Sequence, residues 1–539
     1  LRNAPDGTSE SDGNPLERTV DRYAVLEGNL QIIGSAFLGI TVQCARCHDH
    51  KFEPFAQREY YSLQALLLPA YNPTKWLSPK ERPVMIGTEA ERKANKEKLD
   101  TYGKESKALQ ESQEGLVKPL RKLLLDENLQ KLPAETRTAL NKALEKKEKE
   151  RSEEMKALLK KNANLVEIQS KDLQKRFPEL AAAIRTSEEA LKSLEKRRPS
   201  PLPQISILSE TPDPVPVHHV LVRGNYAKPG EEAPPAVPAF LHGDSFSVQP
   251  ASNTSGRRLA FAQWLTSPKH PTFARLAVNR IWQHHFGVGI VPTSDNFGVT
   301  GAKPSHPELL DYLASEFIRT GWSAKAMHRM IVNSATYRQS ATMREESFKQ
   351  DPDNRLLWRF PIQRLDAEAV RDSILAVTGE LDAKSGGPYV PKAKTAEGEY
   401  VINETEPGAH RRSLYLQQKR TNPITLLDVF DPAKMNPNCA QRTQSTVALQ
   451  SLTLLNSGFI RTRSKAFAQG VLKEPQPVRV QRAFERAMGR RPSPAEIQAA
   501  EDFLRKQATE YSDKPNPELA AYTDFCQMIF ASNGFLYVE

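Results

Sequence analysis

The sequence predicts a mainly α-helical, multidomain protein with a long charged helical hairpin arm and a small strand-bearing segment. Apolar residues recur at steps of three and four along most of the chain, which is typical of helices packed on one face. One long stretch, residues 89–198, consists mainly of Lys, Glu, Leu, Ala and Gln. A proline-rich stretch with short strand-like runs follows it. At 539 residues the chain is long enough for several domains.

We divide the chain into four parts at these changes in composition. The parts are an N-terminal domain at 1–80, the charged helical arm at 81–198, a proline-rich, strand-bearing linker at 199–250, and a helical domain at 251–539. In the arm we expect two or three long helices that fold back on one another. It serves either as a spacer or partner-binding arm, or simply as a solvated insertion.

The first domain opens on residues 1–14, whose Gly, Ser, Asp and Asn content predicts an irregular or disordered segment. Helical periodicity then runs over 16–38, and a second short helix is expected at 59–68. Prolines after position 68 end this unit.

Between these helices lies the sequence Cys44-Ala45-Arg46-Cys47-His48. This is the spacing of covalent c-type haem attachment, in which the two thiols add to the haem vinyl groups and the adjacent imidazole binds the iron. Cys44, Cys47 and His48 are therefore the predicted cofactor-binding residues, with haem c as the cofactor. An apolar wall is expected from residues that follow the motif: Phe52, Phe55, Tyr60 and Tyr61.

Two other interpretations of the motif remain open. Cys44, Cys47, His48 and His50 are four metal-ligand side chains, and two sulfur and two nitrogen ligands suit zinc. Alternatively, the motif is two buried free thiols beside a surface histidine.

The rest of the chain is predicted mostly helical, with a few strands. In the linker, strands are expected at 205–208 and 219–222. In the last domain, strands are expected at 400–403 and 413–417, with an extended end at 535–538. The expected helices there are 257–265, 273–286, 307–320, 324–334, 366–380, 445–456, 478–488, 494–510 and 518–531.

Charge and hydropathy narrow the possible partners. The net charge is +10, but Lys and Glu are interleaved and no compact patch of Arg and aromatic residues occurs. This pattern indicates a solubilising surface, so we expect no nucleic-acid partner. No stretch approaches 18 apolar residues, so we expect no transmembrane segment. Cys439 and Cys526 are either free or paired, and the sequence leaves the oligomeric state open.

Several segments together resemble the planctomycete cytochrome-type secreted proteins. Two of them are Cys44-Ala45-Arg46-Cys47-His48-Asp49-His50 and Asn279-Arg280-Ile281-Trp282-Gln283-His284-His285-Phe286-Gly287. The full set covers 36–54, 279–287, 295–298, 304–310, 334–340, 364–372, 411–415 and 445–456. Those proteins carry a planctomycete cytochrome c domain followed by two domains of unknown function.

The resemblance implies an exported protein of the periplasm or cell surface, without an established reaction. Residues 1–80 resemble the C-terminal part of the first unknown-function domain, and 251–539 resemble the second. The separate cytochrome c domain is not in this sequence. We expect the signal for export to lie outside it as well, and we expect the sequence to begin partway through the first domain.

The second domain offers weaker candidates. The resemblance covers His284 and His285. We select His284 as a candidate distal iron ligand or catalytic base. The alternative is that it forms a hydrogen bond between helices. Ser305 is expected to cap the helix that starts near Pro307. Glu368 and Arg371, three apart on a helix, are expected to form an ion pair.

The best functional interpretation is an exported, c-type-haem-bearing protein in electron transfer or redox chemistry at the cell surface, with a redox partner. The first alternative is a structural or polysaccharide-binding surface protein with a zinc or structural Cys/His knot. The second is a hydrolase in polymer breakdown. No phosphate loop, Gly-x-Ser-x-Gly or Ser-x-x-Lys motif is present, so the sequence assigns no catalytic residue and leaves it uncertain whether the protein is an enzyme.

Overall fold

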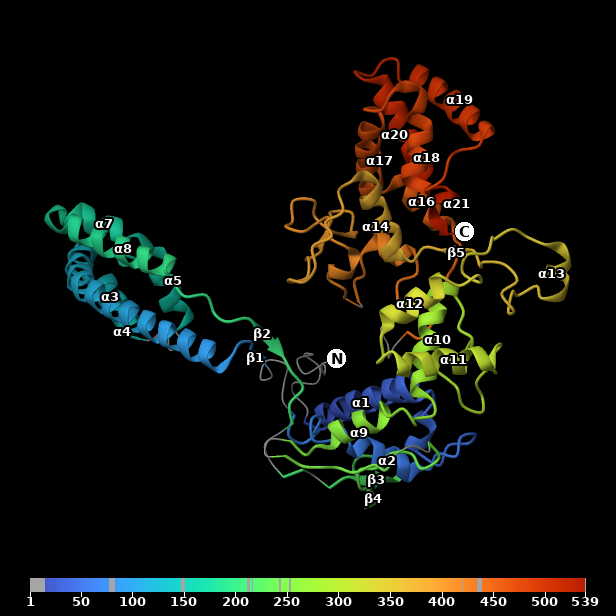
Figure 1. Ribbon diagram of the computed structural model, residues 1–539. Helices are drawn as coiled ribbons and strands as arrows, with labels where there is room; N and C mark the ends of the chain where they lie inside the picture. The colour runs from blue at the N-terminus through green and yellow to red at the C-terminus, as the bar shows by residue number, and fades with distance from the viewer. Residues whose placement is uncertain are drawn as a thin grey trace. The chain divides into compact units, whose positions relative to one another are not determined.

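The computed structural model confirms the mainly helical class, and the strands among its described residues form short antiparallel pairs (Figure 1). The structure describes residues 15–76, 83–146, 151–210, 214–215, 217–241, 244–251, 254–419, 421–433 and 439–538. The segment 1–14, which was expected to be irregular, lies outside these described residues.

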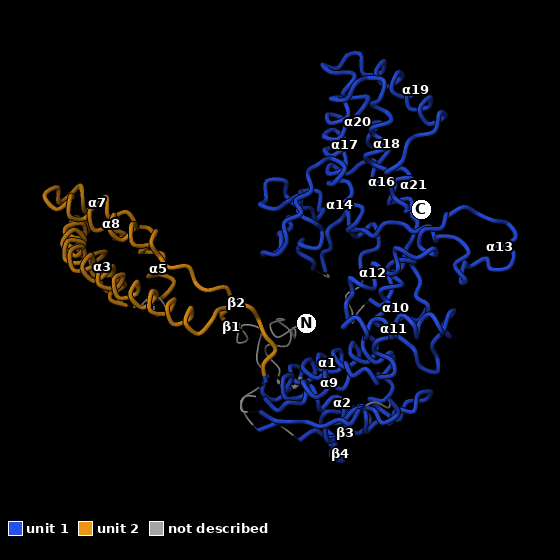
Figure 2. The backbone as a smooth tube through the Cα atoms, in the orientation of Figure 1, with its two compact units in different colours: residues 1–76, 210–539 blue, residues 77–209 orange. Residues whose placement is uncertain are grey.

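The chain forms two compact units (Figure 2). One combines residues 1–76 with 210–539, and the other is residues 77–209. The sequence analysis placed the arm at 81–198 and a separate linker at 199–250. In the structure, residues from 210 onward belong to the same unit as the N-terminal domain.

The unit at 77–209 is built on the helix α3 (Glu89–Gln130), which begins with a capping box between Thr88 and Glu91. Helix α8 (Ala181–Lys196) packs along α3, and strands β1 (Pro83–Met85) and β2 (Gln204–Ser206) pair antiparallel. The shorter helices are α4 (Ala134–Glu145), α5 (Glu153–Lys161), α6 (Ala163–Val166) and α7 (Ser170–Arg176). A small core of its own holds this unit together, made of Val117, Leu124, Leu173 and Ile184.

The larger unit begins with a helical layer around the cysteine motif. Helix α1 (Pro15–Ile33) continues into a π-helical turn (Gly34–Leu38), so the helix predicted at 16–38 is confirmed. Helix α2 (Gln57–Ala65) confirms the second prediction. The other elements here are β3 (His219–Leu221), β4 (Pro229–Glu232) and α9 (Arg257–Leu265). Their shared core includes Leu38, Phe55, Tyr61, Leu221 and Trp264.

A second group of helices follows: α10 (Phe273–Phe286), α11 (Pro307–Arg319), α12 (Ala324–Val332) and α13 (Glu345–Gln350). The first three pack around a core that includes Trp282, Phe286, Leu313, Met327 and Ile331.

The C-terminal group is the largest. Its helices are α14 (Ala367–Thr378), α15 (Thr425–Val429), α16 (Ala448–Asn456), α17 (Gly458–Val471), α18 (Arg479–Met488), α19 (Pro494–Glu510), α20 (Pro517–Phe530) and α21 (Asn533–Leu536). Strand β5 (Gln363–Arg364) pairs with β8 (Tyr537–Val538), and β6 (Ala393–Lys394) pairs with β7 (Tyr400–Val401). Helix α17, which the sequence analysis did not predict, packs centrally against α20.

The strand predicted at 413–417 is wrong over Ser413–Tyr415, which form a 3-10 turn, whereas Leu416 makes an isolated parallel bridge to Val390. The backbone N–H and hydroxyl of Ser413 both donate to the Asp372 carboxylate, at 2.8 and 2.7 Å. A side-chain partner therefore replaces the ladder bond that a strand residue would make here.

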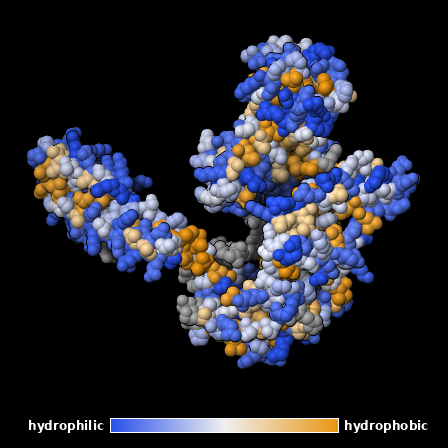
Figure 3. Space-filling view, viewed as in Figure 1, coloured by the Kyte–Doolittle hydropathy of each residue, from blue (hydrophilic) through white to orange (hydrophobic). Residues whose placement is uncertain are grey.

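Polar and apolar residues are mixed over the face seen in Figure 3. Within the described ranges, none of the helices combines the length and the apolar content that crossing a membrane requires.

Candidate functional site

The cysteine motif lies on a short turn at the surface of the larger unit. Cys44 is in the 3-10 turn Gln43–Arg46, and Cys47 is the residue that ends it. Both thiols are exposed and unbridged. The Cys47 thiol donates to the carbonyl oxygen of Arg223, 3.6 Å from its sulfur. The two thiols are therefore accessible from solvent in their reduced form.

Side chains of the neighbouring helices hold the backbone of this turn, and the Tyr61 side chain among them is buried. The carbonyl oxygen of Arg46 accepts hydrogen bonds from the Tyr61 hydroxyl at 2.8 Å and the Gln57 amide at 3.0 Å. The Arg46 guanidinium lies 3.0 Å from the Glu27 carboxylate and donates to the carbonyl of Gly224 at 3.2 Å. Burial raises the pKa of the Tyr61 hydroxyl, so this donor keeps its proton at every physiological pH.

His48 is exposed, and one of its ring nitrogens has a defined partner. Nδ1 lies 2.6 Å from the carbonyl oxygen of Asp49. A carbonyl oxygen can only accept, so Nδ1 carries the hydrogen in this contact. In the neutral ring, Nε2 then keeps a free lone pair. This is the tautomer in which metal-bound histidines coordinate through Nε2 while Nδ1–H donates to a carbonyl.

His50 has a different environment from His48. It is only 8 % exposed, and its Nδ1 accepts hydrogen bonds from the backbone N–H groups of Glu53 at 2.9 Å and Phe52 at 3.3 Å. Its Nε2 then carries the hydrogen and faces the Thr41 hydroxyl at 3.4 Å. One ring nitrogen of His50 thus closes the loop that follows the motif, and the other faces the segment that precedes it.

The four residues considered for zinc are not preassembled. Among the residues that the structure describes, no three or more His, Cys, Asp or Glu side chains are grouped so that they could hold a metal ion. In particular, His50 faces inward to its own loop while Cys44, Cys47 and His48 are exposed. Recruiting all four to one ion requires breaking the His50 contacts.

The expectation of an apolar wall after the motif is wrong for three of its four residues. Phe55, Tyr60 and Tyr61 are at most 2 % exposed and belong to the core of the N-terminal helical layer. Phe55 packs edge-on against Phe240 at a ring distance of 6.3 Å. Only Phe52, 54 % exposed, lies at the surface beside the motif loop. These side chains gain more from burial in the protein core than from lining an open site.

The segments on both sides of the motif form hydrogen bonds with the second helical group. The backbone N–H of Phe297 donates to the carbonyl of Gly39 at 2.7 Å. The N–H of Val299 donates to the buried carboxylate of Glu53 at 2.9 Å. The Thr272 hydroxyl donates to the carbonyl of Leu38 at 3.0 Å. The motif loop is therefore held at both ends by residues more than 200 positions away in the chain.

His284 is exposed and lines a pocket of about 750 Å³ together with Cys439. The lining also includes Arg280, Arg442 and Asp366, but none of the described motif residues. Its assignment as a distal iron ligand stays a prediction. His285 instead makes the interhelix hydrogen bond, with its Nε2 2.8 Å from Nδ1 of His328.

Two local expectations in this part of the chain are wrong. The N-cap of α11 is His306, with Pro307 at the first helical position, while the Ser305 hydroxyl donates to the carbonyl of Ile290 at 3.3 Å. Ser305 is thus used by the preceding loop.

The second is the ion pair between Glu368 and Arg371, which does not form. Glu368 pairs with Arg442 at 2.5 Å. Arg371 is 3 % exposed and donates to the carbonyls of Arg411 at 3.0 Å and Ala409 at 2.6 Å. Its guanidinium points into the C-terminal core, away from the helix surface where the pair was expected.

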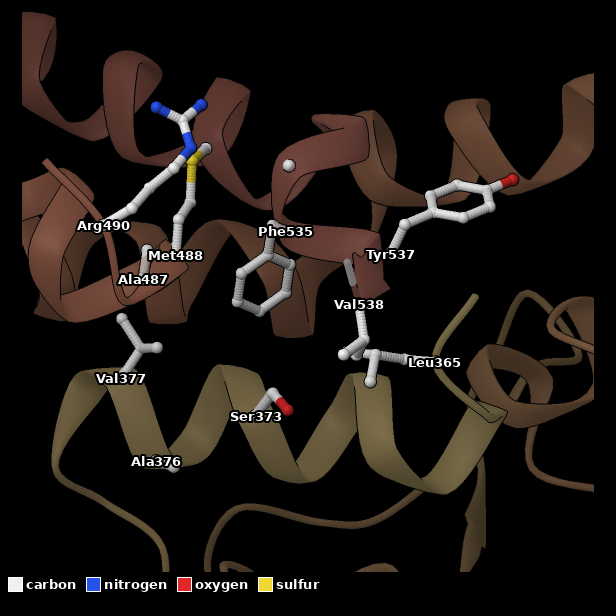
Figure 4. A pocket seen from close by; sticks show the side chains of 11 residues that line it. Leu365, Ser373, Ala376, Val377, Ala487, Met488, Arg490, Phe535, Tyr537 and Val538 are labelled. Carbon is white, nitrogen blue, oxygen red and sulfur yellow. The ribbon is translucent and has the colours of Figure 1, made fainter. Parts of the chain in front are cut away.

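A further pocket, of about 700 Å³, lies in the C-terminal group (Figure 4). Its lining includes the apolar side chains of Val377, Met488 and Phe535, and the Arg490 guanidinium in the same lining is paired with Glu496 at 2.7 Å. The sequence left open whether Cys439 and Cys526 are free or paired. Both are free, and Cys439 is exposed whereas Cys526 is buried.

Three contacts of the candidate residues were not predicted from the sequence. The Asp49 carbonyl orients His48, and Cys439 lines the same pocket as His284. His328 is the hydrogen-bond partner of His285. Only the first is close to its partner in sequence. The other two come from segments that only tertiary folding brings together.

Two family models match the chain. Residues 7–71 match PSCyt2, a protein of unknown function (DUF1549), and residues 257–504 match PSD1, a protein of unknown function (DUF1553). The first match contains the cysteine motif, and the second contains His284 and Cys439. Searches of curated proteins and of solved structures gave no match.

Proposed function

Because the chain belongs to the family of planctomycete cytochrome-c-associated proteins that carry these two domains of unknown function, we propose that it holds haem c and transfers electrons at the cell surface. Cys44 and Cys47 are the covalent anchors, and His48 is the axial ligand. Export to the periplasm or cell surface is part of this proposal, as is a redox partner.

The observation that carries the proposal is the hydrogen bond from Nδ1 of His48 to the carbonyl of Asp49. It leaves Nε2, the iron-binding nitrogen, unprotonated and exposed. The two neighbouring thiols are free and exposed as well. All three donors that c-type attachment requires are therefore accessible in the chemical form that it requires.

A bound haem supplies a one-electron redox couple. The residues of this chain attach it, orient it and limit its motion. The Tyr61 and Gln57 bonds to the Arg46 carbonyl keep the turn between the two thiols in place. The Asp49 carbonyl fixes the orientation of the His48 ring, so His48 would present its Nε2 to a bound haem in one orientation.

A zinc knot is the alternative with the same residues. It is less well supported, because one ring nitrogen of His50 accepts hydrogen bonds from its own loop and the other faces the Thr41 hydroxyl. A polysaccharide-binding role is supported by a separate observation. The pocket beside His284 is lined by the side chains of Gln441 and Gln444 together with the charged groups of Arg280, Asp366 and Arg442, and such polar groups suit sugar hydroxyls.

The mass of the intact protein tests covalent attachment. The full chain is produced with the haem-maturation machinery, and its mass is compared with that of the Cys44→Ser/Cys47→Ser variant. We expect the wild-type chain to gain the mass of one haem and the double variant to gain none. Cys439→Ser, an exposed cysteine outside the motif, is the matched control and should keep the adduct. A wild-type chain without added mass would overturn the proposal.

A further inference from the structure

Two imidazoles from different helices meet at the surface of the second helical group. His285 is near the end of α10, and His328 is in the middle of α12. Their facing nitrogens, Nε2 and Nδ1, are 2.8 Å apart, and the ring planes are inclined by 66°. His328 is exposed and His285 is partly so. One ring donates to the other, so at least one nitrogen lone pair is already directed at the gap between them.

The two rings stand on well-packed supports. On α10, His285 is flanked by the buried Trp282 and Phe286, and its ring meets the edge of Tyr337 at 5.5 Å. On α12, His328 follows the fully buried Met327. Since both helices belong to one core, packing fixes where the two histidines are attached, and each ring keeps only its own side-chain rotation.

The present nitrogen separation is that of a hydrogen bond, and it lies closer to the spacing of neighbouring ligands in one coordination geometry than in another. Imidazole nitrogens bind divalent transition metals at about 2.0–2.1 Å, so two of them 2.8 Å apart subtend roughly 85–90° at a shared ion. That is the angle between neighbouring ligands in a tetragonal site, which Cu(II) and Ni(II) favour. A tetrahedral zinc ion needs the two nitrogens about 3.3 Å apart at the same bond lengths.

We propose that His285 and His328 form a two-imidazole site for a tetragonal divalent transition metal, with Cu(II) as the best fit. Each ring turns from its partner toward the ion, which replaces the hydrogen bond, and water fills the remaining positions on the exposed side. The pair is not among the haem-motif residues, so this inference is independent of the proposed function.

The test measures Cu(II) binding to the full chain produced without haem. The exposed thiols of Cys44, Cys47 and Cys439 bind copper themselves, so they are alkylated in every sample. Binding is measured by calorimetry, and the bound ion is characterised by electron paramagnetic resonance. We expect one tight Cu(II) per chain, with a tetragonal spectrum that shows nitrogen ligands.

Paired variants separate metal binding from folding. His285→Gln and His328→Gln keep a side chain that can hydrogen-bond across the helices but remove the imidazole ligand. Each should weaken Cu(II) binding at least tenfold with little change in the melting temperature. His306→Ala, a partly exposed histidine at the start of α11, should bind as the wild type does. Unchanged affinity in either glutamine variant, or loss in only one of them, would overturn the assignment.

Discussion

His48 and His50 lie two positions apart, yet their rings have opposite surroundings. The ring of His48 is exposed and oriented through one nitrogen, whereas that of His50 is buried and bonded through both. The difference follows from the loop that closes after the motif, where the N–H of His50 donates to the carbonyl of Phe55 at 2.9 Å. His48 thus suits a ligand role and His50 a structural one.

This contrast predicts the effect of His50→Ala. The variant leaves the N–H groups of Glu53 and Phe52 without their acceptor, which should lower the free energy of unfolding by about 1–3 kcal/mol. Denaturant titration checks the stability, and the spectrum of the matured protein checks the cofactor. We expect the cofactor to remain. If His50→Ala removes bound metal as thoroughly as Cys44→Ser does, and no haem is found, the zinc knot is the correct interpretation.

A second residue-scale prediction concerns pH. His218 is buried, its Nε2–H donates to Gln64 Oε1 at 2.7 Å, and burial lowers its pKa to about 4. A histidine whose pKa is lower in the folded chain stabilises the fold above its unfolded pKa of about 6.5, and this contribution is lost as the pH falls toward the folded value. Between pH 7.5 and pH 5 the loss should be about 2 kcal/mol.

The measurement is the free energy of unfolding of wild type and His218→Asn at both pH values. The difference between the two proteins isolates this residue from other titrating groups, such as the buried His270. The variant should be less stable at pH 7.5 but should lose less stability on acidification. Parallel pH dependence in the two proteins would rule out this role for His218.

For single residues, the sequence predicted features that depend only on residues close together in the chain. The spacing of Cys44, Cys47 and His48 indicates an attachment site without reference to the fold. The contacts that decide between neighbouring histidines could not be foreseen, because they depend on how a loop closes. The interhelix pair of His285 with His328 joins positions 43 apart, and no periodicity signals it.

Among the elements, helices with a strong apolar period were predicted well. The helices expected at 257–265 and 273–286 match α9 and α10 in both bounds. The helix expected at 16–38 ends in a π-helical turn at Gly34–Leu38. The spacing of apolar residues does not distinguish such a turn from an α-helix. That turn stops at Gly39, which adopts the left-handed conformation with φ of 70°. The chain then turns toward the cysteine motif.

A substitution at Gly39 tests how tightly the junction between the π-helical turn and the cysteine motif is packed. A Cβ at position 39 would meet Leu276 at 3.1 Å and Phe297 at 3.2 Å, in a backbone conformation that disfavours side chains. Gly39→Ala should therefore lower the free energy of unfolding by more than the roughly 1–2 kcal/mol of the left-handed backbone alone. Gly321→Ala is the matched control, since its φ is 68° and no atom lies within 4 Å of the added Cβ. Equal losses in the two variants would show that the junction is loosely packed.

For the whole molecule, the two matched domains and the arm differ in how they are held. Residues on both sides of the motif bond to the second matched domain, whereas the arm has a core and a strand pair of its own. The composition of 89–198 foretold its helices. It could not foretell the strand pair of Pro83–Met85 with Gln204–Ser206, because these strands are short and far apart in sequence.

The arm should therefore be dispensable for the fold of the larger unit. The N–H of Ile86 donates to the carbonyl of Pro203 at 2.8 Å, so a short Gly/Ser linker can join the two strands after residues 88–201 are removed. We expect the shortened protein to stay soluble and its thermal transition to shift by only a few degrees. Aggregation on removal of the arm would show that the arm covers a core.

The central claim, a haem held covalently at Cys44 and Cys47, is tested most directly by an absorbance spectrum. The full chain is expressed with haem-maturation machinery, denatured, and extracted with organic solvent. We expect a sharp Soret band that stays with the protein through both steps, because thioether bonds survive treatments that release ligated haem. A colourless protein that contains zinc would contradict the claim.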